Sequence, residues 1–284
     1  MKILLFGILM LSSLSYAEPT FDIRLSSGTI KQGQSVRLDL TSSHPLREVR
    51  LNWAHRRYRM FPVKANTYAA YLGIPRELPA KDYAIELDLV LPTGQRFAKS
   101  VPITVTDGEF IKATLTLPPA KESLASNLKQ LNEEGNIIEK QFGLLTNKLL
   151  FESPFEIPAK GQITSPFGAI RMYNKIITRN HAGVDIGNQA NTPIHAPNSG
   201  KVVLSETLKS HGETIIIDHG FGILTIYNHL NHRDVAVGDS VKKGQTIGRM
   251  GMTGIANGPH LHWGMSVQGV RVNPLFWVGN NFKP

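Results

Sequence analysis

The chain has 284 residues, a formal net charge of +9 and 41% hydrophobic residues. That length suggests two domains, and the composition is that of a globular protein with enough apolar residues for a core in each. Cysteine is absent, which excludes disulfides, thiolate zinc sites, cysteine nucleophiles and a lipid attached through an N-terminal cysteine.

Residues 1–17 have the pattern of a secretory signal peptide. Lys2 supplies the positive start, a mostly apolar run covers residues 3–14, and Ser15-Tyr-Ala17 forms a small-x-small exit. The run is too short to span a bilayer comfortably. We therefore expect cleavage after Ala17 and export, with no stable membrane insertion of the mature chain; a retained anchor is the alternative.

Residues 18–108 are predicted to form a small β-sandwich-like domain. Short alternating stretches at 36–40, 49–53 and 85–90 are separated by turn signals rich in glycine and proline. No catalytic constellation occurs here, so a role in recognition, positioning or shielding of the second domain is expected.

A cluster of arginines lies within this first region, at positions 47, 50, 56, 57 and 59. Nucleic acid is not the expected partner, because no nucleic-acid motif accompanies the cluster and the chain carries an export signal. The basic charge fits attraction to anionic envelope polymers. It fits a solubility role equally well.

Residues 109–152 are predicted to be a helical linker. An apolar stripe with steps of three and four indicates an amphipathic helix; its members are Leu124, Leu128, Leu131, Ile138, Phe142, Leu145 and Leu149. Gly135 occupies the missed position and is expected to weaken or break the helix, at about 1 kcal/mol relative to alanine. Packing on one of the domains is favoured over a coiled-coil dimer, and the oligomeric state stays open.

Residues 153–284 are predicted to form an all-β domain of ordinary size, with strands near 201–204, 214–218 and 224–227. In the segment His260-Leu-His262, side chains two apart on a strand project to the same side. One histidine could then bind zinc while the other serves as an acid–base group, with Leu261 in the core. In the segment His181-Ala-Gly-Val-Asp185, we expect His181 and Asp185 to be a pair of possible zinc ligands on a loop that leads into a strand.

Each pattern arises easily by chance, so spacing alone does not decide whether these residues form a metal site. The structural alternatives are a histidine capped by a carboxylate and a pair of exposed histidines on a strand. Two histidines and one aspartate would leave a fourth tetrahedral position for water, as a catalytic zinc requires. His229 and His260 could then act as general base and oxyanion stabiliser. The sequence contains no Gly-x-Ser-x-Gly, Walker or His-Glu-x-x-His motif. The histidines at 195, 211, 219 and 232 have no partner pattern and are expected to have structural roles.

Six segments in order resemble the lysostaphin-like, or LytM-domain, zinc metallopeptidases. They are residues 161–168 (GQITSPFG), 181–186 (HAGVDI), 192–197 (TPIHAP), 227–230 (YNHL), 241–248 (VKKGQTIG) and 258–263 (GPHLHW). The likeness covers about residues 153–278. Asn191 stands where the family usually has glycine.

The resemblance implies that His181, Asp185 and His262 bind Zn²⁺ and that His229 and His260 are the catalytic histidines. It implies an antiparallel β domain with an open metal groove, and cleavage of amide bonds in peptidoglycan stem peptides with a zinc-bound water as nucleophile. The region before this domain is similar to Gram-negative envelope members, which implies a periplasmic location and the D-alanine to diaminopimelate cross-link; glycine-bridge cleavage is the alternative. A second possibility is a non-catalytic, wall-binding activator of an amidase. A third is an enzyme held latent by its N-terminal part.

Overall fold

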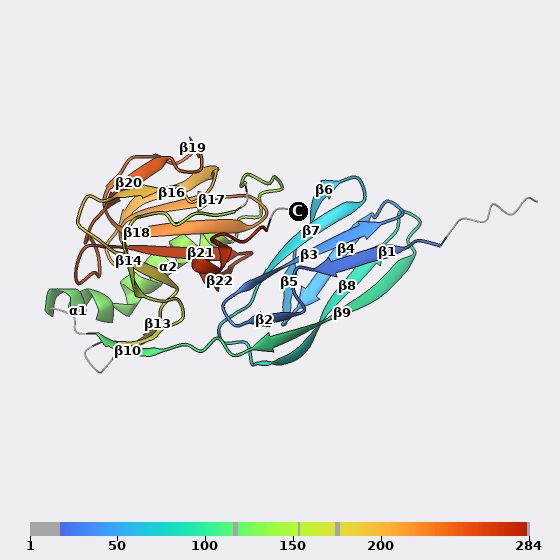
Figure 1. The fold of residues 1–284 in the computed structure, drawn as a ribbon, viewed down its shortest axis with the longest axis horizontal. Helices are drawn as coiled ribbons and strands as arrows, with labels where there is room; N and C mark the ends of the chain where they lie inside the picture. Colours follow the sequence, from blue (N-terminus) through green and yellow to red (C-terminus); the bar gives the residue numbers. More distant parts are fainter. Residues whose placement is uncertain (1–17, 116–118, 153, 174–176, 283–284) are drawn as a thin grey trace, which may run out of the picture.

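The computed structural model describes residues 18–282 apart from 116–118, 153 and 174–176. The predicted signal peptide lies outside these residues. The fold is mainly β, with two β regions next to each other along the long axis of the molecule (Figure 1). This confirms the predicted fold class. Within the described ranges, no helix is long and apolar enough to cross a membrane.

Two sheets form the N-terminal region. One has the order β1-β3-β7-β6 and the other β2-β9-β8-β4-β5. Neighbouring strands are antiparallel except β2 and β9, which are parallel. The three stretches singled out in the sequence lie in β3, β4 and β8. The strands are β1 Phe21–Leu25, β2 Thr29–Lys31, β3 Ser35–Ser42, β4 Glu48–Trp53, β5 Arg56–Tyr58, β6 Phe61–Lys64, β7 Thr67–Gly73, β8 Lys81–Val90 and β9 Arg96–Thr106.

Strand β3 shows why these residues form a sandwich. Val36, Leu38 and Leu40 are fully buried, whereas Arg37 and Asp39 between them are half-buried. A period of two places one face of the strand in the core and the other toward solvent. The alternation in the sequence therefore becomes one wall of a hydrophobic core.

The connecting segment contains strand β10 (Lys112–Leu115) and two helices, α1 (Pro119–Ser126) and α2 (Leu128–Phe142). Gly135 was predicted to weaken or break the helix, and the break is wrong, since that residue lies inside α2. The helices instead separate at Asn127, whose side-chain oxygen accepts a hydrogen bond from the Gln130 backbone N–H at 3.1 Å. This N-cap satisfies a backbone donor that the first turn of α2 leaves free.

The apolar stripe of the linker is shorter than predicted. Leu145 and Leu149 lie beyond the end of α2, and Leu128 is 64% exposed. Ile138 and Phe142 are buried in a cluster with side chains of the C-terminal sheet. The linker therefore packs on that region, as the favoured interpretation predicted.

The C-terminal region is built on one ten-stranded sheet. Its main order is β11-β14-β21-β18-β17-β16-β19, with β15, β20 and β22 attached. β10, β12 and β13 form a separate small sheet in which β10 runs parallel to β12. The elements are β11 Gln162–Ser165, β12 Ile170–Tyr173, β13 Ile177–Asn180, β14 Gly183–Gly187, β15 Pro193–His195, β16 Gly200–Leu208, β17 Gly212–Asp218, β18 Ile223–Arg233, β19 Ser240–Val241, β20 Thr246–Met250, β21 His260–Val267, β22 Val270–Val272 and the 3₁₀ helix η1 Pro274–Trp277.

The two β regions share one hydrophobic core. Phe61 stacks on Phe221 with ring centroids 4.6 Å apart. Gln268, in the turn after β21, donates side-chain hydrogen bonds to the carbonyls of Arg59 and Tyr71 at 3.0 and 3.1 Å. These contacts hold the N-terminal sandwich in a defined position beside the sheet that carries the histidines.

Candidate active site

The three predicted metal ligands converge on one point. Asp185 on β14 lies directly opposite His262 on the neighbouring antiparallel strand β21. His181 precedes β14 by two residues, as expected for a loop leading into a strand. His181 Nε2, Asp185 Oδ1 and His262 Nδ1 are each 3.0 Å from the other two. This group could hold a metal ion.

The donor set fits zinc. Two imidazole nitrogens and one carboxylate oxygen are ordinary zinc ligands, and a tetrahedral ion with bonds of about 2.0–2.2 Å brings its ligands to roughly this separation. His181 Nδ1 donates to the carbonyl of Pro166 at 2.8 Å, which leaves Nε2 with the lone pair in the neutral ring. Burial alone would raise the pKa of Asp185, but the imidazoles of His181 and His262 beside its Oδ1 hold that pKa well below its ordinary value.

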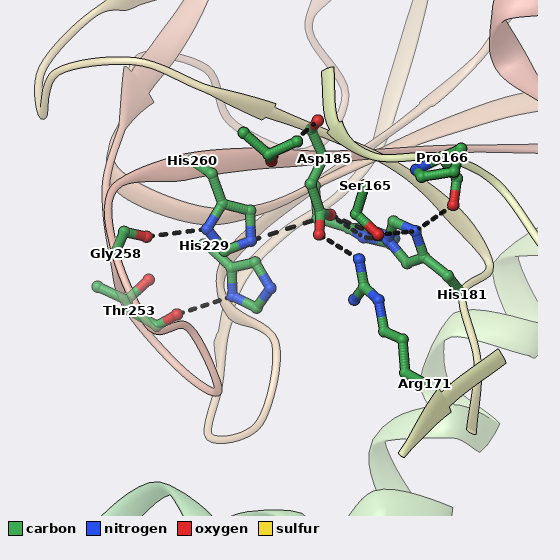
Figure 2. Close-up of polar contacts among 11 residues, drawn as sticks. Ser165, Pro166, Arg171, His181, Asp185, His229, Thr253, Gly258 and His260 are labelled. Carbon is green, nitrogen blue, oxygen red and sulfur yellow. Dashed lines mark hydrogen bonds and ion pairs between the residues drawn. The ribbon is translucent and has the colours of Figure 1, made fainter. Parts of the chain in front are cut away.

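Arg171 is a site residue that the sequence did not single out. It lies on β12, and its guanidinium donates to Asp185 Oδ2 (Figure 2). The other oxygen of this carboxylate faces His181 and His262, so Arg171 holds the carboxylate with one oxygen toward the metal position. Arg171 lies fourteen residues before Asp185, and no known ligand spacing relates the two positions. Its only sequence signal is that it closely follows the family-like segment 161–168.

His260 occupies the same face of β21 as His262, while Leu261 between them is fully buried in the core. This confirms the predicted geometry of the His-x-His pair. His260 Nδ1 lies 2.8 Å from the carbonyl of Gly258. Its Nε2 is 3.9 Å from Asp185 Oδ1, so the second nitrogen is directed to the metal position.

His229 reaches the same place from β18. Between β17 and β18 the register shifts, and two residues of β18, Asn228 and His229, oppose Thr214 alone. His229 has a φ of +63°, and such a bulge redirects a side chain. Its Nδ1 lies 2.8 Å from the carbonyl of Thr253, and its ring centroid is 4.8 Å from that of His260.

The environment of His229 favours its neutral form. Burial lowers its pKa well below the ordinary value, and the neighbouring His260 and His262 lower it further. A neutral ring whose Nδ1 donates to a carbonyl keeps a lone pair on Nε2, which is the atom a general base needs. Figure 2 shows the rings of His229 and His260 together beside Asp185.

Two cavities are lined in part by these residues. One, of about 210 Å³, is lined by His181, His229 and His262 and is bounded by linker residues such as Leu131. The other, of about 340 Å³, is lined by residues that include Asp185 and His260. Both cavities therefore border the metal position.

His211, for which the sequence predicts a structural role, lines the first of these cavities. Its Nδ1 lies 2.8 Å from Glu134 Oε2 on α2, and its carbonyl accepts a hydrogen bond from the His229 N–H at 2.9 Å. Glu134 also accepts from the Ser210 N–H. The linker helix therefore contacts the loop that supports His229.

Residues 179–274 match the model of peptidase family M23. This C-terminal region is an M23 peptidase domain. A solved structure of a putative peptidase M23 from Pseudomonas aeruginosa shares the fold, with a TM-score of 0.64, 23% identity, and coverage of 87% of this chain and 94% of that one.

Two curated relatives come from Gram-negative bacteria. The peptidoglycan DD-endopeptidase ShyC of Vibrio cholerae is 35% identical over 137 residues, which are 47% of this chain and 30% of ShyC. The murein hydrolase activator EnvC of Escherichia coli is 33% identical over 97 residues, which are 34% of this chain and 23% of EnvC. The chain spans about a third or less of the length of the curated relatives it matches.

Proposed function

We propose that the protein is a zinc-dependent endopeptidase that acts in the periplasm on amide bonds of peptidoglycan stem peptides or their cross-links. The observation that carries this proposal is the 3.0 Å triangle of donor atoms from His181, Asp185 and His262 with two more imidazoles beside it. In this proposal these three residues hold Zn²⁺, and His229 and His260 are the catalytic residues.

A zinc ion bound there would supply Lewis-acid activation of water and of the scissile carbonyl. The rest of the chemistry belongs to the two histidines. One neutral Nε2 takes a proton from the attacking water and can return it to the leaving amine, while the other ring, with a proton on each nitrogen, donates an Nε2–H hydrogen bond to the developing oxyanion. Because the carbonyls of Thr253 and Gly258 fix both Nδ1 atoms, neither ring must reorient for this role.

The proposed bond is the D-alanine to diaminopimelate cross-link, and glycine-bridge cleavage is the alternative. Support comes from the DD-endopeptidase name of ShyC and from the net charge of +9, which draws the chain to acidic wall peptides.

The second candidate function, activation of a partner amidase, is supported by the similarity to EnvC. An activator has no need of a metal site or of catalytic histidines. Here all five side chains are present and face one another, which favours the enzyme.

Digestion of purified peptidoglycan by the mature chain, with mass analysis of the products, tests the proposal. We expect near-stoichiometric zinc, new fragments from cleaved cross-links, loss of cleavage on metal removal and recovery on zinc addition. Unchanged cleavage by metal-free protein contradicts it. Binding to the wall without cleavage, together with faster hydrolysis by an added amidase, would support the activator instead.

A further inference from the structure

A third cavity, of about 240 Å³, lies between the N-terminal sandwich and the M23 domain. Asn180, His181 and Ala182 line both this cavity and the one beside the metal site. The two hollows therefore border the same segment, which includes a proposed zinc ligand.

Three arginines line this cavity: Arg56 on β5, Arg76 in the loop after β7, and Arg271 on β22. Two come from the N-terminal sandwich and one from the M23 domain, so neither region forms the cavity alone. Guanidinium groups bind carboxylates through paired, parallel N–H···O hydrogen bonds. A cavity lining that includes three arginines is a chemical signal for an anionic ligand.

Each arginine is anchored by a separate contact. Arg56 Nη2 donates to the carbonyl of Gln268 at 3.2 Å. The guanidinium of Arg76 lies 4.6 Å from the ring centroid of Phe110, and that of Arg271 lies 4.0 Å from the ring centroid of Phe142. Anchored side chains lose less entropy when a ligand binds.

Acidic neighbours neutralise this charge only in part. Arg271 pairs with Glu139 at 2.7 Å. Arg76 Nη1 is 3.6 Å from Glu77 Oε1, but the Glu77 side chain is 66% exposed. Arg76 Nε is buried, with no hydrogen-bond partner among the described residues.

We propose that this cavity is a carboxylate-binding subsite that takes a free carboxylate of the acidic stem peptide while a nearby amide lies at the metal site. The inference rests on the proposed function for the identity of the substrate. It gives the N-terminal sandwich a direct part in recognition, since Arg56 and Arg76 both belong to it.

The test uses the full mature chain with Arg56→Gln and Arg76→Gln. Arg57→Gln is the matched control, because Arg57 is exposed and follows Arg56 on β5 but does not line the cavity. Substrates are a synthetic cross-linked stem-peptide dimer with free carboxylates and the same dimer with those carboxylates amidated. We expect kcat/KM for the acidic dimer to fall about 10-fold in each cavity variant, through loss of one charged hydrogen-bonded contact, with the change mainly in KM.

The amidated dimer should be cut equally by the wild type and all three variants. An equal loss on both dimers, or no loss, overturns the proposal. Circular dichroism and thermal unfolding show whether each variant is folded. If Arg76→Gln unfolds because it loses the Phe110 contact, Arg56→Gln gives the answer by the same comparison.

A binding experiment separates this inference from the proposed function. If the wild type cuts neither dimer, the endopeptidase proposal fails. Calorimetry with an uncross-linked acidic tetrapeptide and its amidated form still tests the subsite. Tighter binding of the acidic form that disappears in Arg56→Gln and persists in Arg57→Gln supports it, and equal binding of both forms overturns it.

Discussion

Asp185 and His262 lie opposite each other on adjacent antiparallel strands, with Oδ1 and Nδ1 3.0 Å apart. Two proposed ligands are thus fixed by the hydrogen-bonded register of β14 and β21. The register also places a glycine, Gly187, opposite His260. A shift of one residue between these strands would send the ligand side chains to opposite faces.

Replacement of Asp185 by alanine should abolish metal binding. The change removes one of three proposed ligands, and loss of a supporting group alone costs about 10–100-fold in affinity, so a fall of at least about 100-fold is expected. Metal content after dialysis, measured by plasma mass spectrometry, checks this. Asp82→Ala, an exposed change on β8, is the control. Full zinc content in Asp185→Ala would refute the assignment.

His229→Ala and His260→Ala should separate catalysis from metal binding. Neither side chain belongs to the 3.0 Å triangle, so zinc content should stay near that of the wild type. Cleavage should fall by about 10²–10⁴-fold, the usual contribution of a general acid–base group. His232→Ala is the control, because the His232 side chain is 71% exposed. Release of zinc by either variant would contradict this division of roles.

Arg171→Met should destabilise the metal-free protein more than the zinc-loaded protein. The Arg171 and Asp185 side chains are only 11% and 9% exposed, and removal of one partner of a buried pair costs about 3–5 kcal/mol. In the zinc-loaded variant, the bound ion would balance the negative charge of the Asp185 carboxylate that Arg171 no longer pairs with. Thermal unfolding with and without zinc should therefore show a larger stabilisation by zinc in the variant. A smaller stabilisation by zinc in the variant would mean that Arg171 mainly orients Asp185 for metal binding.

His219 should make the protein sensitive to moderate acid. Burial lowers its pKa from 6.5 to about 4, so between these pH values the unfolded chain binds a proton that the folded chain does not. The contribution of neutral His219 to the free energy of unfolding is therefore fully present above pH 6.5. About 3 kcal/mol of this free energy is lost as the pH falls to about 4. Urea unfolding of metal-free wild type and His219→Gln across this range should show a steeper pH dependence in the wild type. The same pH dependence of stability in the wild type and in His219→Gln would contradict this prediction.

A fragment that begins at residue 153 should be less stable than the mature chain. We propose the division 18–108, 109–152 and 153–284 for the domains, yet Phe221 stacks on Phe61 across the boundary and the two regions share one core. Removal of residues 18–152 would expose this apolar surface. Dye-binding and thermal unfolding measure the effect. A fragment as stable as the mature chain would show that the regions fold independently.

That shared core also changes how latency can be tested. Greater activity of the short fragment would be difficult to separate from its loss of stability. Glu134→Gln in the full chain is a better probe, because Glu134 contacts Ser210 and His211 next to His229. Faster cleavage by this variant would support a latent enzyme, and unchanged cleavage would remove the idea.

Local patterns could be read directly from the sequence. A period of two placed His260 and His262 on one face of a strand with Leu261 in the core, and the structure confirms this. Asn191, which stands where the family usually has glycine, has a φ of +67°. Asparagine tolerates that region better than most residues, so the turn is kept.

Contacts between distant segments were decided only by the tertiary structure. The bulge that redirects His229, the approach of Arg171 to Asp185 and the three-arginine cavity all depend on strand pairings and packing between separate elements. The sequence by itself determined the strand periodicity, the His-x-His geometry and the family-like motifs, because these depend on residues close together in the chain. Register, bulges and the shared core required the fold, since they depend on which strands meet and which apolar faces cover one another.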